Sequence, residues 1–205
     1  MIALIDYGAG NVRSVEKALR TVGAAVTVTQ DPSTVLAAEK VVLPGVGAFA
    51  DCMQSLRRLD MIDPIHTIAA RGTPFLGICV GLQVLFEEGT EMGRHEGLGL
   101  LPGRVVRFEL PAEFKVPHTG WNQIRPIKTT PLFEGLPKGA WAYFNHGYYG
   151  QAREAHTLAV TDYGIDFACA VQRDNVYGIQ FHPEKSQQVG LRILKNFVEL
   201  IEPSR

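Results

Sequence analysis

The first half of the chain alternates short apolar runs with segments of helical periodicity, and this alternation constrains the fold more than any other feature. Runs rich in Val, Ile and Leu predict strands at residues 2–5, 25–29, 40–44 and 75–79. Helical spacing of apolar residues predicts helices at residues 12–22, 48–70 and 80–88. Parallel strands joined by crossover helices give this pattern, because such a sheet is buried on both faces. We therefore predict a doubly wound α/β sheet.

The second half is dense in β-forming and turn residues. Strands are predicted at residues 103–110, 120–126, 140–149, 156–161, 167–172 and 176–181, and we interpret them as antiparallel. Residues 189–201 return to helical spacing and are expected to pack back on the sheet. No repeat or flexible linker separates the halves. Residues 1–205 are therefore predicted to form a single α/β domain, with a mostly parallel sheet flanked by helices and antiparallel β-rich additions in the second half.

Charge and cysteine content exclude several classes of protein. The chain has 20 Lys and Arg against 21 Asp and Glu, which gives no electrostatic reason to expect nucleic acid or an anionic membrane as a partner. Its 3 cysteines form no C-x-x-C pair, which argues against a disulfide framework or a thiolate zinc site. The N-terminus lacks the basic region of a secretory signal, and no apolar run is long enough to span a membrane. We expect a cytoplasmic protein.

The strongest chemical motif is Gly77-Ile78-Cys79-Val80-Gly81. A nucleophilic residue flanked by glycines, after an apolar strand and before a helix, is typical of a nucleophile elbow. The sharp turn exposes the sulfur above the sheet at a helix N-terminus, and the glycines allow strand and helix to approach closely. Cys79 is therefore a predicted nucleophile. The alternative is a buried structural cysteine at a strand end.

Among the histidines, His182 is the best placed to serve this cysteine. It follows the apolar run 177–181, which puts it at the carboxyl end of a strand, where open α/β sheets hold their ligands. In an extended segment stiffened by Pro183, the side chains of His182 and Glu184 point the same way. We therefore predict a triad of nucleophile, imidazole and orienting carboxylate. A surface loop with solvated His and Glu is the alternative interpretation.

A glycine-rich turn, Gly45-Val46-Gly47, follows the predicted strand 40–44. Its backbone N–H groups, together with that of Val80 just after the nucleophile, are candidates for an oxyanion hole. A simple tight turn between strand and helix explains these glycines equally well.

Neither a metal site nor a cofactor is predicted. Gly8-Ala9-Gly10 follows the first strand, but Arg13 occupies the place of the third glycine of a dinucleotide-binding motif. The other histidines show no spacing typical of metal ligands, and His118 and His146 are isolated in β-rich stretches.

These motifs resemble the triad (class I) glutamine amidotransferases, through GICVG at 77–81 and FHPE at 181–184, in the order the family has them. Within that family the chain is most similar to the glutaminase subunits of imidazole glycerol phosphate synthases. Further segments carry this resemblance: IDYGAGN at 5–11, LPGVGAF at 43–49, KVPHTGWN at 115–122 and FHPEKS at 181–186. Together the segments extend over nearly the whole chain.

The resemblance implies the same roles for the triad and adds contacts to substrate and partner. It implies that Gln83 contacts the substrate glutamine, and that a nearby acid holds the substrate α-ammonium. We place that role on Glu91, with Glu96 as the alternative. The resemblance also implies that the turn at residues 45–47 forms the oxyanion hole only when the synthase partner signals, and that Lys185 faces this partner.

The implied activity is hydrolysis of L-glutamine to glutamate and ammonia through a cysteine thioester. Free ammonia would be protonated in neutral water, so a closed interface must deliver it to an acceptor. Because the resemblance extends over nearly the whole chain, we expect the acceptor site on another polypeptide. The resemblance implies a heterodimer with a (β/α)₈ cyclase subunit that makes imidazole glycerol phosphate in histidine biosynthesis.

Four residues depart from the family pattern, and three other functions are weighed against the implied one. Val80 and Leu82 stand where leucine and methionine are more usual, and both changes are tolerated in volume. Asn145 stands where the family tends to have an apolar residue, and Gly147 stands where serine is usual. The alternatives are a glutaminase subunit serving another synthase, such as that of pyridoxal phosphate synthesis, a cysteine hydrolase on the same scaffold, and a non-catalytic module with a vestigial triad.

Overall fold

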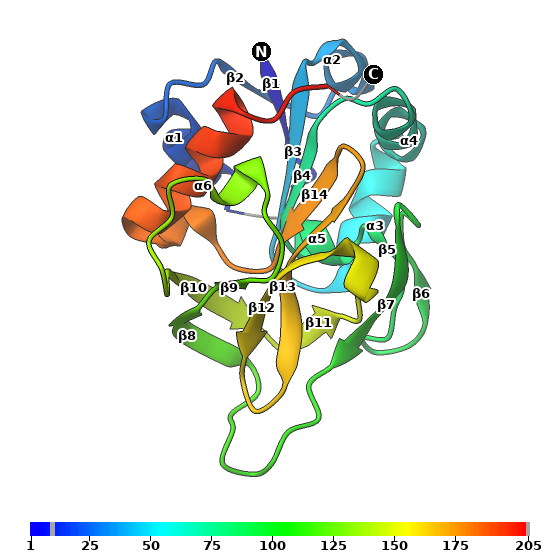
Figure 1. The fold of residues 1–205 in the computed structure, drawn as a ribbon. Coiled ribbons are helices and arrows are strands. Elements are labelled where there is room, and N and C mark those ends of the chain that lie inside the picture. Colours follow the sequence, from blue (N-terminus) through cyan, green and yellow to red (C-terminus); the bar gives the residue numbers. More distant parts are fainter. Residues whose placement is uncertain (9–10, 204–205) are drawn as a thin grey trace.

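A mixed eight-stranded sheet runs through the centre of the computed structural model, which describes residues 1–8 and 11–203 (Figure 1). The strand order is β2-β1-β3-β4-β14-β13-β12-β9. The parallel strands are β2 (Val26–Thr29), β1 (Ile2–Ile5), β3 (Lys40–Gly45), β4 (Phe75–Cys79) and β14 (Val176–Ile179). The antiparallel strands are β13 (Asp166–Arg173), β12 (Thr157–Asp162) and β9 (Arg125–Pro126). The predicted mostly parallel α/β sheet is confirmed.

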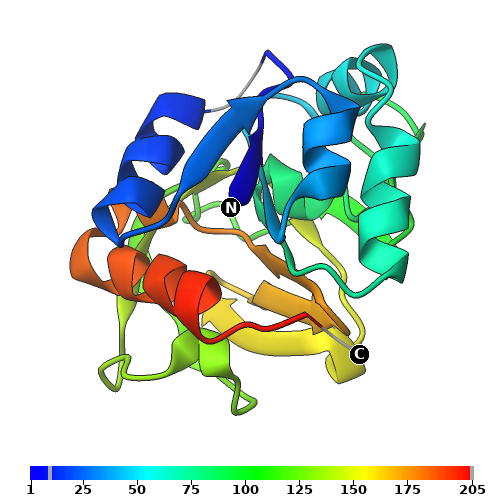
Figure 2. The same ribbon diagram turned by 90° about the horizontal axis from the view of Figure 1, so that it is seen from above.

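Helices cover both faces of this sheet (Figure 2). One face carries α1 (Val12–Thr21) and α6 (Gln187–Glu199), and the other carries α2 (Pro32–Ala37), α3 (Phe49–Arg58) and α4 (Ile62–Ala70). Every residue of β1, β4 and β14 is buried, as expected for strands covered on both sides. The apolar runs therefore became the central strands because both of their faces pack against helices.

Two predicted helices differ from the structure. The predicted helix 48–70 is interrupted after α3, where Asp60 has a φ of 52° that no helix accommodates. The predicted helix 80–88 ends early, as the short α5 (Val80–Gln83), and β5 (Phe86–Gly89) follows. In β5, Phe86 pairs with Leu101 of β7, so strand pairing prevails over the local helical pattern.

One helix was missed by the sequence analysis. Helix α2 begins after Asp31, whose carboxylate accepts a hydrogen bond from the Ser33 backbone N–H at 3.0 Å. Pro32 at the first helical position adds to this start signal. The helix is only one to two turns long, which is why its apolar periodicity is too short to recognise.

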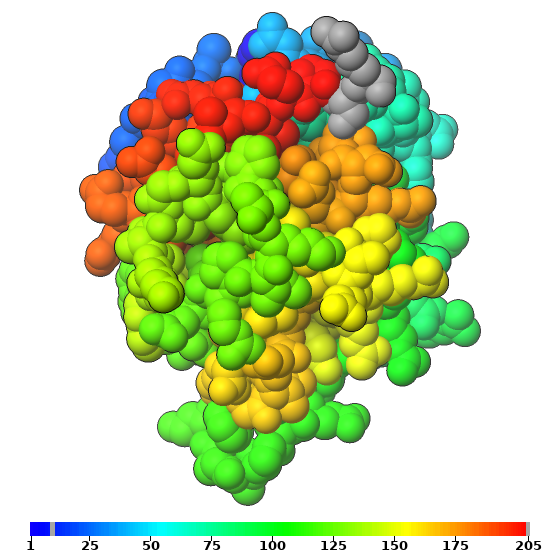
Figure 3. All heavy atoms as spheres, in the orientation of Figure 1, coloured from blue at the N-terminus to red at the C-terminus, as the bar shows by residue number. Residues whose placement is uncertain are grey.

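The β-rich half builds two further small sheets. One has the order β11-β7-β5-β6 and the other pairs β10 with β8. Their strands are β5, β6 (His95–Glu96), β7 (Leu101–Arg107), β8 (His118–Gln123), β10 (Trp141–His146) and β11 (Tyr148–Gly150). Short 3₁₀ turns lie at η1 (Pro131–Phe133), η2 (Glu154–His156) and η3 (Pro183–Lys185). Residues 109–117, between β7 and β8, form a loop that projects from the body of the molecule (Figure 3).

The prediction that all strands of the second half are antiparallel is wrong for two of them. Strand β14 is antiparallel to β13 but parallel to β4 on its other edge, and β7 is parallel to β5. Of the glycine-rich segment Gly8-Ala9-Gly10, residues 9 and 10 lie outside the described residues. In the described part of the chain, none of the helices combines the length and apolarity that crossing a membrane requires.

Candidate active site

Cys79 lies at a sharp turn between β4 and α5. Its φ of 55° and ψ of −110° are unusual for a residue with a side chain, and such conformations cost about 1–3 kcal/mol. Close packing enforces the turn. A Cβ on Gly77 would lie 2.4 Å from the Gly81 carbonyl oxygen, and a Cβ on Gly81 would lie 2.0 Å from the Leu43 carbonyl oxygen. The flanking glycines thus let β4, α5 and β3 meet, as the elbow motif predicts.

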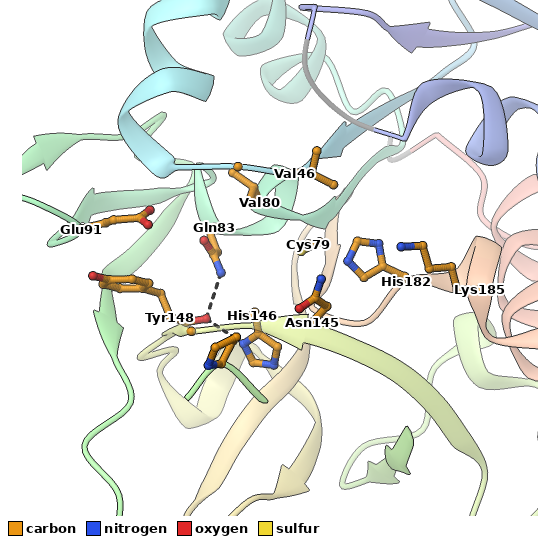
Figure 4. Close-up of a pocket in the computed structure, with 13 residues that line it drawn as sticks. Val46, Cys79, Val80, Gln83, Glu91, Asn145, His146, Tyr148, His182 and Lys185 are labelled. Carbon is orange, nitrogen blue, oxygen red and sulfur yellow. Dashed lines mark hydrogen bonds between the residues drawn. The ribbon is translucent and has the colours of Figure 1, made fainter. Parts of the chain in front are cut away.

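The parallel pairing of β4 with β14 brings His182 to this turn. Gly77 is in register with Gly178 and Ile78 with Ile179, so both strands end at the same edge of the sheet. Cys79 and His182 line one pocket, with a volume of about 200 Å³, and their side chains are neighbours in Figure 4. The structure therefore brings together two residues that are far apart in the sequence.

Glu184 lies behind the imidazole, away from the pocket. Its Oε1 accepts a hydrogen bond from His182 Nδ1 at 2.9 Å, and its side chain is fully buried. The same oxygen accepts from Asn11 Nδ2 at 3.2 Å. Asn11 is the N-cap residue of α1, but its side chain makes no capping bond. The Asn11 amide instead donates to the Glu184 carboxylate and so connects the start of α1 to the site.

The surroundings of His182 favour its charged form. Burial alone would lower the pKa of the imidazole, but hydrogen bonds and charge interactions with Cys79 and Glu184 outweigh it and raise the pKa to about 10. At neutral pH the ring therefore carries a proton. An imidazolium next to a cysteine stabilises negative charge on the sulfur, which is the reactive form.

Gln180 and Ser186 also belong to the site and were missed. Gln180 is completely buried, and its Nε2 donates to Cys79 Sγ at 3.7 Å. Ser186 Oγ donates to the His182 carbonyl oxygen at 2.6 Å and accepts from the Tyr143 backbone N–H at 2.9 Å. These bonds fix η3 against β10. A buried glutamine at the end of an apolar run was the only signal in the sequence for Gln180.

Most of the predicted site residues line the same pocket. They are Val46, Gly47, Cys79, Val80, Gln83, Glu91, His182 and Lys185. Gly45 and Glu184 do not line it: Gly45 is paired with Cys79 at the end of β3, and Glu184 supports the imidazole from behind.

Of the two acids considered for the substrate ammonium, Glu91 is at the pocket and Glu96 is not. Glu91 Oε2 accepts from the Phe49 backbone N–H at 2.9 Å, at the N-terminus of α3. The Glu96 side chain is 87% exposed and lies 4.0 Å from Arg57 on the surface. Gln83 is buried, and its Nε2 donates to the Tyr148 carbonyl oxygen at 3.0 Å.

The glycine-rich turn lies directly beside the nucleophile. A Cβ on Gly45 would lie 2.4 Å from the Gly81 nitrogen and 2.9 Å from the Tyr7 hydroxyl oxygen, so only glycine fits. The backbone N–H of Val46 faces that hydroxyl oxygen, which is buried and makes no hydrogen bond within the described residues. The turn is thus placed for an oxyanion hole, while its Val46 N–H is directed at Tyr7.

A family assignment follows from the sequence. The model of one family, described as glutamine amidotransferase class-I, matches residues 3–200. The chain belongs to the class-I glutamine amidotransferase family. Among curated relatives, "Imidazole glycerol phosphate synthase subunit HisH" of Salinibacter ruber is 52% identical, over 98% of this chain and 94% of the relative. The protein of the same name from Syntrophotalea carbinolica is 54% identical, over 98% of this chain and 100% of the relative.

Solved structures of low identity share the fold. A crystal structure described as a glutamine amidotransferase has a TM-score of 0.77 at 20% identity, covering 98% of this chain and 99% of that one. The structure of PurLQS from Thermotoga maritima has a TM-score of 0.75 at 19% identity, covering 98% of each chain. These likenesses agree with the predicted α/β class.

The departures at Asn145 and Gly147 both line the pocket. Asn145 Oδ1 accepts from Thr119 Oγ1 at 3.0 Å. A Cβ on Gly147 would lie 3.6 Å from Val116 Cγ1, an ordinary contact, so nothing steric requires glycine there. At the pocket edge, Lys185 Nζ lies 5.6 Å from the centre of the Tyr143 ring.

The description of His118 and His146 as isolated is wrong. The β8–β10 register places them directly opposite each other, with His118 Nδ1 and His146 Nε2 3.3 Å apart. Both are buried, and His146 lines the pocket. Across residues 1–8 and 11–203, no group of three or more His, Cys, Asp or Glu side chains is arranged to hold a metal ion.

Proposed function

We propose that this chain is the glutaminase subunit of a two-chain imidazole glycerol phosphate synthase. The observation that carries the proposal is its identity of 52% with a relative of that name over 98% of the chain. Membership of the amidotransferase family and the contact of Cys79 with His182 support the chemistry. In this proposal residues 1–205 act as one amidotransferase domain, in the cytoplasm and without a cofactor.

The reaction is amide hydrolysis in two steps. The Cys79 sulfur attacks the side-chain carbonyl carbon of glutamine, and a tetrahedral oxyanion forms. When the C–N bond breaks, His182 gives its proton to the leaving nitrogen, so ammonia departs and a thioester remains. Water, deprotonated by His182, then attacks the thioester and releases glutamate. Glu184 holds the imidazole in the required orientation throughout.

Substrate recognition is assigned to two residues at the far end of the pocket. The Glu91 carboxylate pairs with the α-ammonium of glutamine, and Gln83 contacts the same substrate. Glu91 and Gln83 lie on the opposite side of the pocket from His182 (Figure 4), so a glutamine held there by its ammonium would extend its side-chain amide toward Cys79.

The oxyanion hole accounts for regulation by the partner. The N–H groups of Val80 and Val46 are the donors, and in this conformation the Val46 N–H faces Tyr7. Turning the peptide between Gly45 and Val46 brings this N–H to the substrate. Glycines on both sides of Val46 keep such a rotation inexpensive. Binding of the occupied synthase partner shifts the population toward the turned state.

The partner of this proposal is a (β/α)₈ cyclase subunit that receives the ammonia in a heterodimer. Lys185 at the edge of the pocket and the exposed aromatic rings of Trp121 and Trp141 supply a docking surface. Exposed aromatic rings are enriched in protein interfaces.

The proposal is tested with Cys79→Ala in complex with the cyclase subunit. Glutamine-dependent synthesis should fall to the background rate, whereas synthesis from added ammonia should be unchanged. Cys169→Ala, a change at another buried cysteine, is the matched control and should keep glutamine-dependent turnover. Loss of both activities in Cys79→Ala would contradict the catalytic role. Glutaminase stimulation by a pyridoxal phosphate synthase, and not by the cyclase, would overturn the assigned partner.

A further inference from the structure

A line of polar groups runs from β8 into the core of the site. Asn122 Nδ2 lies 3.3 Å from His118 Nε2, His118 Nδ1 lies 3.3 Å from His146 Nε2, and His146 Nδ1 lies 2.8 Å from the Tyr148 carbonyl oxygen. Both imidazoles are buried, with 3% of His118 and 5% of His146 exposed. None of these groups takes part in the bond-breaking steps, so the arrangement has to be explained separately.

The contact of His146 with the Tyr148 carbonyl oxygen, at the inner end of this line, requires one tautomer for each ring. A carbonyl oxygen only accepts, so His146 must carry its proton on Nδ1. Burial lowers the pKa of His146 to about 3 and that of His118 to about 4, so both rings are neutral at pH 7. His146 Nε2 is then an acceptor, and His118 must donate to it from Nδ1. His118 Nε2 is consequently left as an acceptor.

The outer end dictates the same tautomers independently. The Asn122 amide is oriented by two backbone groups: its Oδ1 accepts from the Gln123 N–H at 2.8 Å, and its Nδ2 donates to the Asp162 carbonyl oxygen at 2.8 Å. The remaining Nδ2 proton points at His118 Nε2, which must accept it. The contacts at Asn122 and at the Tyr148 carbonyl therefore require the same proton positions on both imidazole rings.

We propose that Asn122, His118 and His146 are positioning residues, which form a hydrogen-bond chain of fixed direction and hold the Tyr148 carbonyl and the Gln83 amide in place for the substrate. The role in glutamine binding rests on the proposed function. The direction of the chain does not, because it follows from the contacts alone.

The chain continues through the Tyr148 carbonyl to the nucleophile. That oxygen also accepts from Gln83 Nε2 at 3.0 Å (Figure 4). Gln83 Nε2 also lies 3.2 Å from Gln180 Oε1. Both protons of the Gln83 amide are thereby used, so its Oε1 is the end left to accept from a ligand. Gln180 in turn has its Nε2 free to donate to Cys79 Sγ at 3.7 Å.

The direction of the hydrogen-bond chain determines which substrate groups the pocket accepts. The pocket presents an acceptor at Gln83 and a carboxylate at Glu91, so it selects a substrate group that donates, such as an ammonium. If the chain were reversed, the Tyr148 carbonyl would lose its His146 donor, and Gln83 would lose one of the two fixed partners that orient it. The histidine pair thus determines which end of Gln83 meets the substrate.

The test reverses the chain at its outer end with Asn122→Asp. The carboxylate has the same shape but only accepts, so it draws a proton to His118 Nε2 and leaves a lone pair at Nδ1 facing His146. Nitrogen-15 NMR of the full chain at pH 7 should show Nδ1-protonated His118 and His146 in the native protein, and Nε2-protonated or charged His118 in Asn122→Asp. Gln123→Glu, the same charge change on the adjacent exposed residue, should leave both tautomers unchanged.

Kinetics in the complex with the cyclase provide the second measurement. His118→Phe keeps an aromatic ring against Phe144 and Tyr163, which lie 4.9 and 3.9 Å from His118 between ring centres, but removes the donor to His146. It should raise KM for glutamine by about 3- to 10-fold, the effect of one neutral hydrogen bond, with kcat within about twofold. His118→Asn, which retains a donor at the place of Nδ1, should restore most of the affinity.

Each result decides the proposal. Native His146 protonated at Nε2, or charged at pH 7, would overturn it whatever the activity. An unchanged KM in both Asn122→Asp and His118→Phe would overturn the positioning role. If the tautomers are as expected but Cys79→Ala leaves glutamine turnover intact, the proposed function fails while the direction of the chain stands.

Discussion

Glu184, together with Cys79, keeps His182 protonated, although the Glu184 side chain never reaches the pocket. It donates no proton and only accepts, from both His182 and Asn11. Glu184→Gln would keep the shape and remove the charge. We expect kcat of glutamine hydrolysis to fall by about 10²- to 10⁴-fold, because the imidazole loses its orientation and its charge partner. Steady-state kinetics in the cyclase complex measure this.

The matched control for Glu184→Gln is Glu96→Gln, the same change at an exposed acid outside the pocket. It should leave kcat and KM within about twofold of the native values. A Glu184→Gln enzyme as active as this control would show that the carboxylate has no part in orienting His182.

Tyr7 is the second residue whose effect is indirect. Its hydroxyl is the group that the Val46 N–H faces in this conformation. In Tyr7→Phe that partner is absent, so the turned state with the N–H at the substrate is favoured relative to the native protein. We expect glutaminase activity without the cyclase ligand to rise by about 2- to 10-fold, the range for the loss of one weak polar contact. Unchanged basal activity, with the fully stimulated rate also unchanged, would show that Tyr7 does not restrain the turn.

At the scale of elements, close approach at the elbow is the main constraint on β4 and α5. Gly77→Ala places a Cβ 2.4 Å from the Gly81 carbonyl oxygen, which belongs to the backbone and cannot move aside. We expect a loss of about 1–3 kcal/mol or more in the free energy of unfolding, measured by urea denaturation. The control is Gly147→Ala, whose Cβ would meet only side chains at 3.6 and 3.9 Å. Equal stability of the two variants would contradict the packing argument.

Strands and turns could be predicted from the sequence where they leave a local pattern. The strands β1, β3 and β4 and the elbow were predictable because burial on both faces and flanking glycines leave a local pattern. The strand β5 was not, since the pairing of Phe86 with Leu101 depends on residues outside the window in which a helix pattern is recognised. Cys79, His182 and Glu184 lie in two such local motifs, which is why their neighbourhood could be anticipated.

Other residues of the site could not be predicted from the sequence, because their contacts depend on how neighbouring strands are aligned. His118 and His146 meet only because β8 and β10 pair in one alignment, and the connection between these strands gives no indication of which alignment that is. Gln180 was inconspicuous for a related reason. A polar residue in an apolar run gives no information about its partner until β4 and β14 are placed side by side.

For the whole molecule, the buried histidines predict how stability depends on pH. In the folded chain the pKa of His118 is about 4 and that of His146 is about 3, both below the ordinary value near 6.5. Between the folded and the ordinary pKa values, the unfolded chain therefore binds more protons than the folded chain. The stability they provide is therefore complete above about pH 6.5 and is lost as the pH falls. His182, with a folded pKa of about 10, contributes stability that is complete below about pH 6.5 and lost as the pH rises to 10.

The expected result is a maximum of the unfolding free energy near neutral pH, with a decline on both sides. Urea denaturation from pH 4 to pH 10 measures it. In His118→Phe the acid branch should be shallower than in the native protein, because one of the two neutral imidazoles is gone. An acid branch of unchanged slope would contradict neutral burial of His118.

Strand β14 has a parallel neighbour on one edge and an antiparallel neighbour on the other. The thiol and the imidazole follow β4 and β14, whereas the Tyr148 carbonyl that holds Gln83, and the histidines behind it, come from the β-rich segment. The two parts of the pocket can therefore be exchanged separately. Grafting residues 101–150 from a distant homologue is expected to change how the substrate ammonium is bound, while Cys79 and His182 remain those of the recipient.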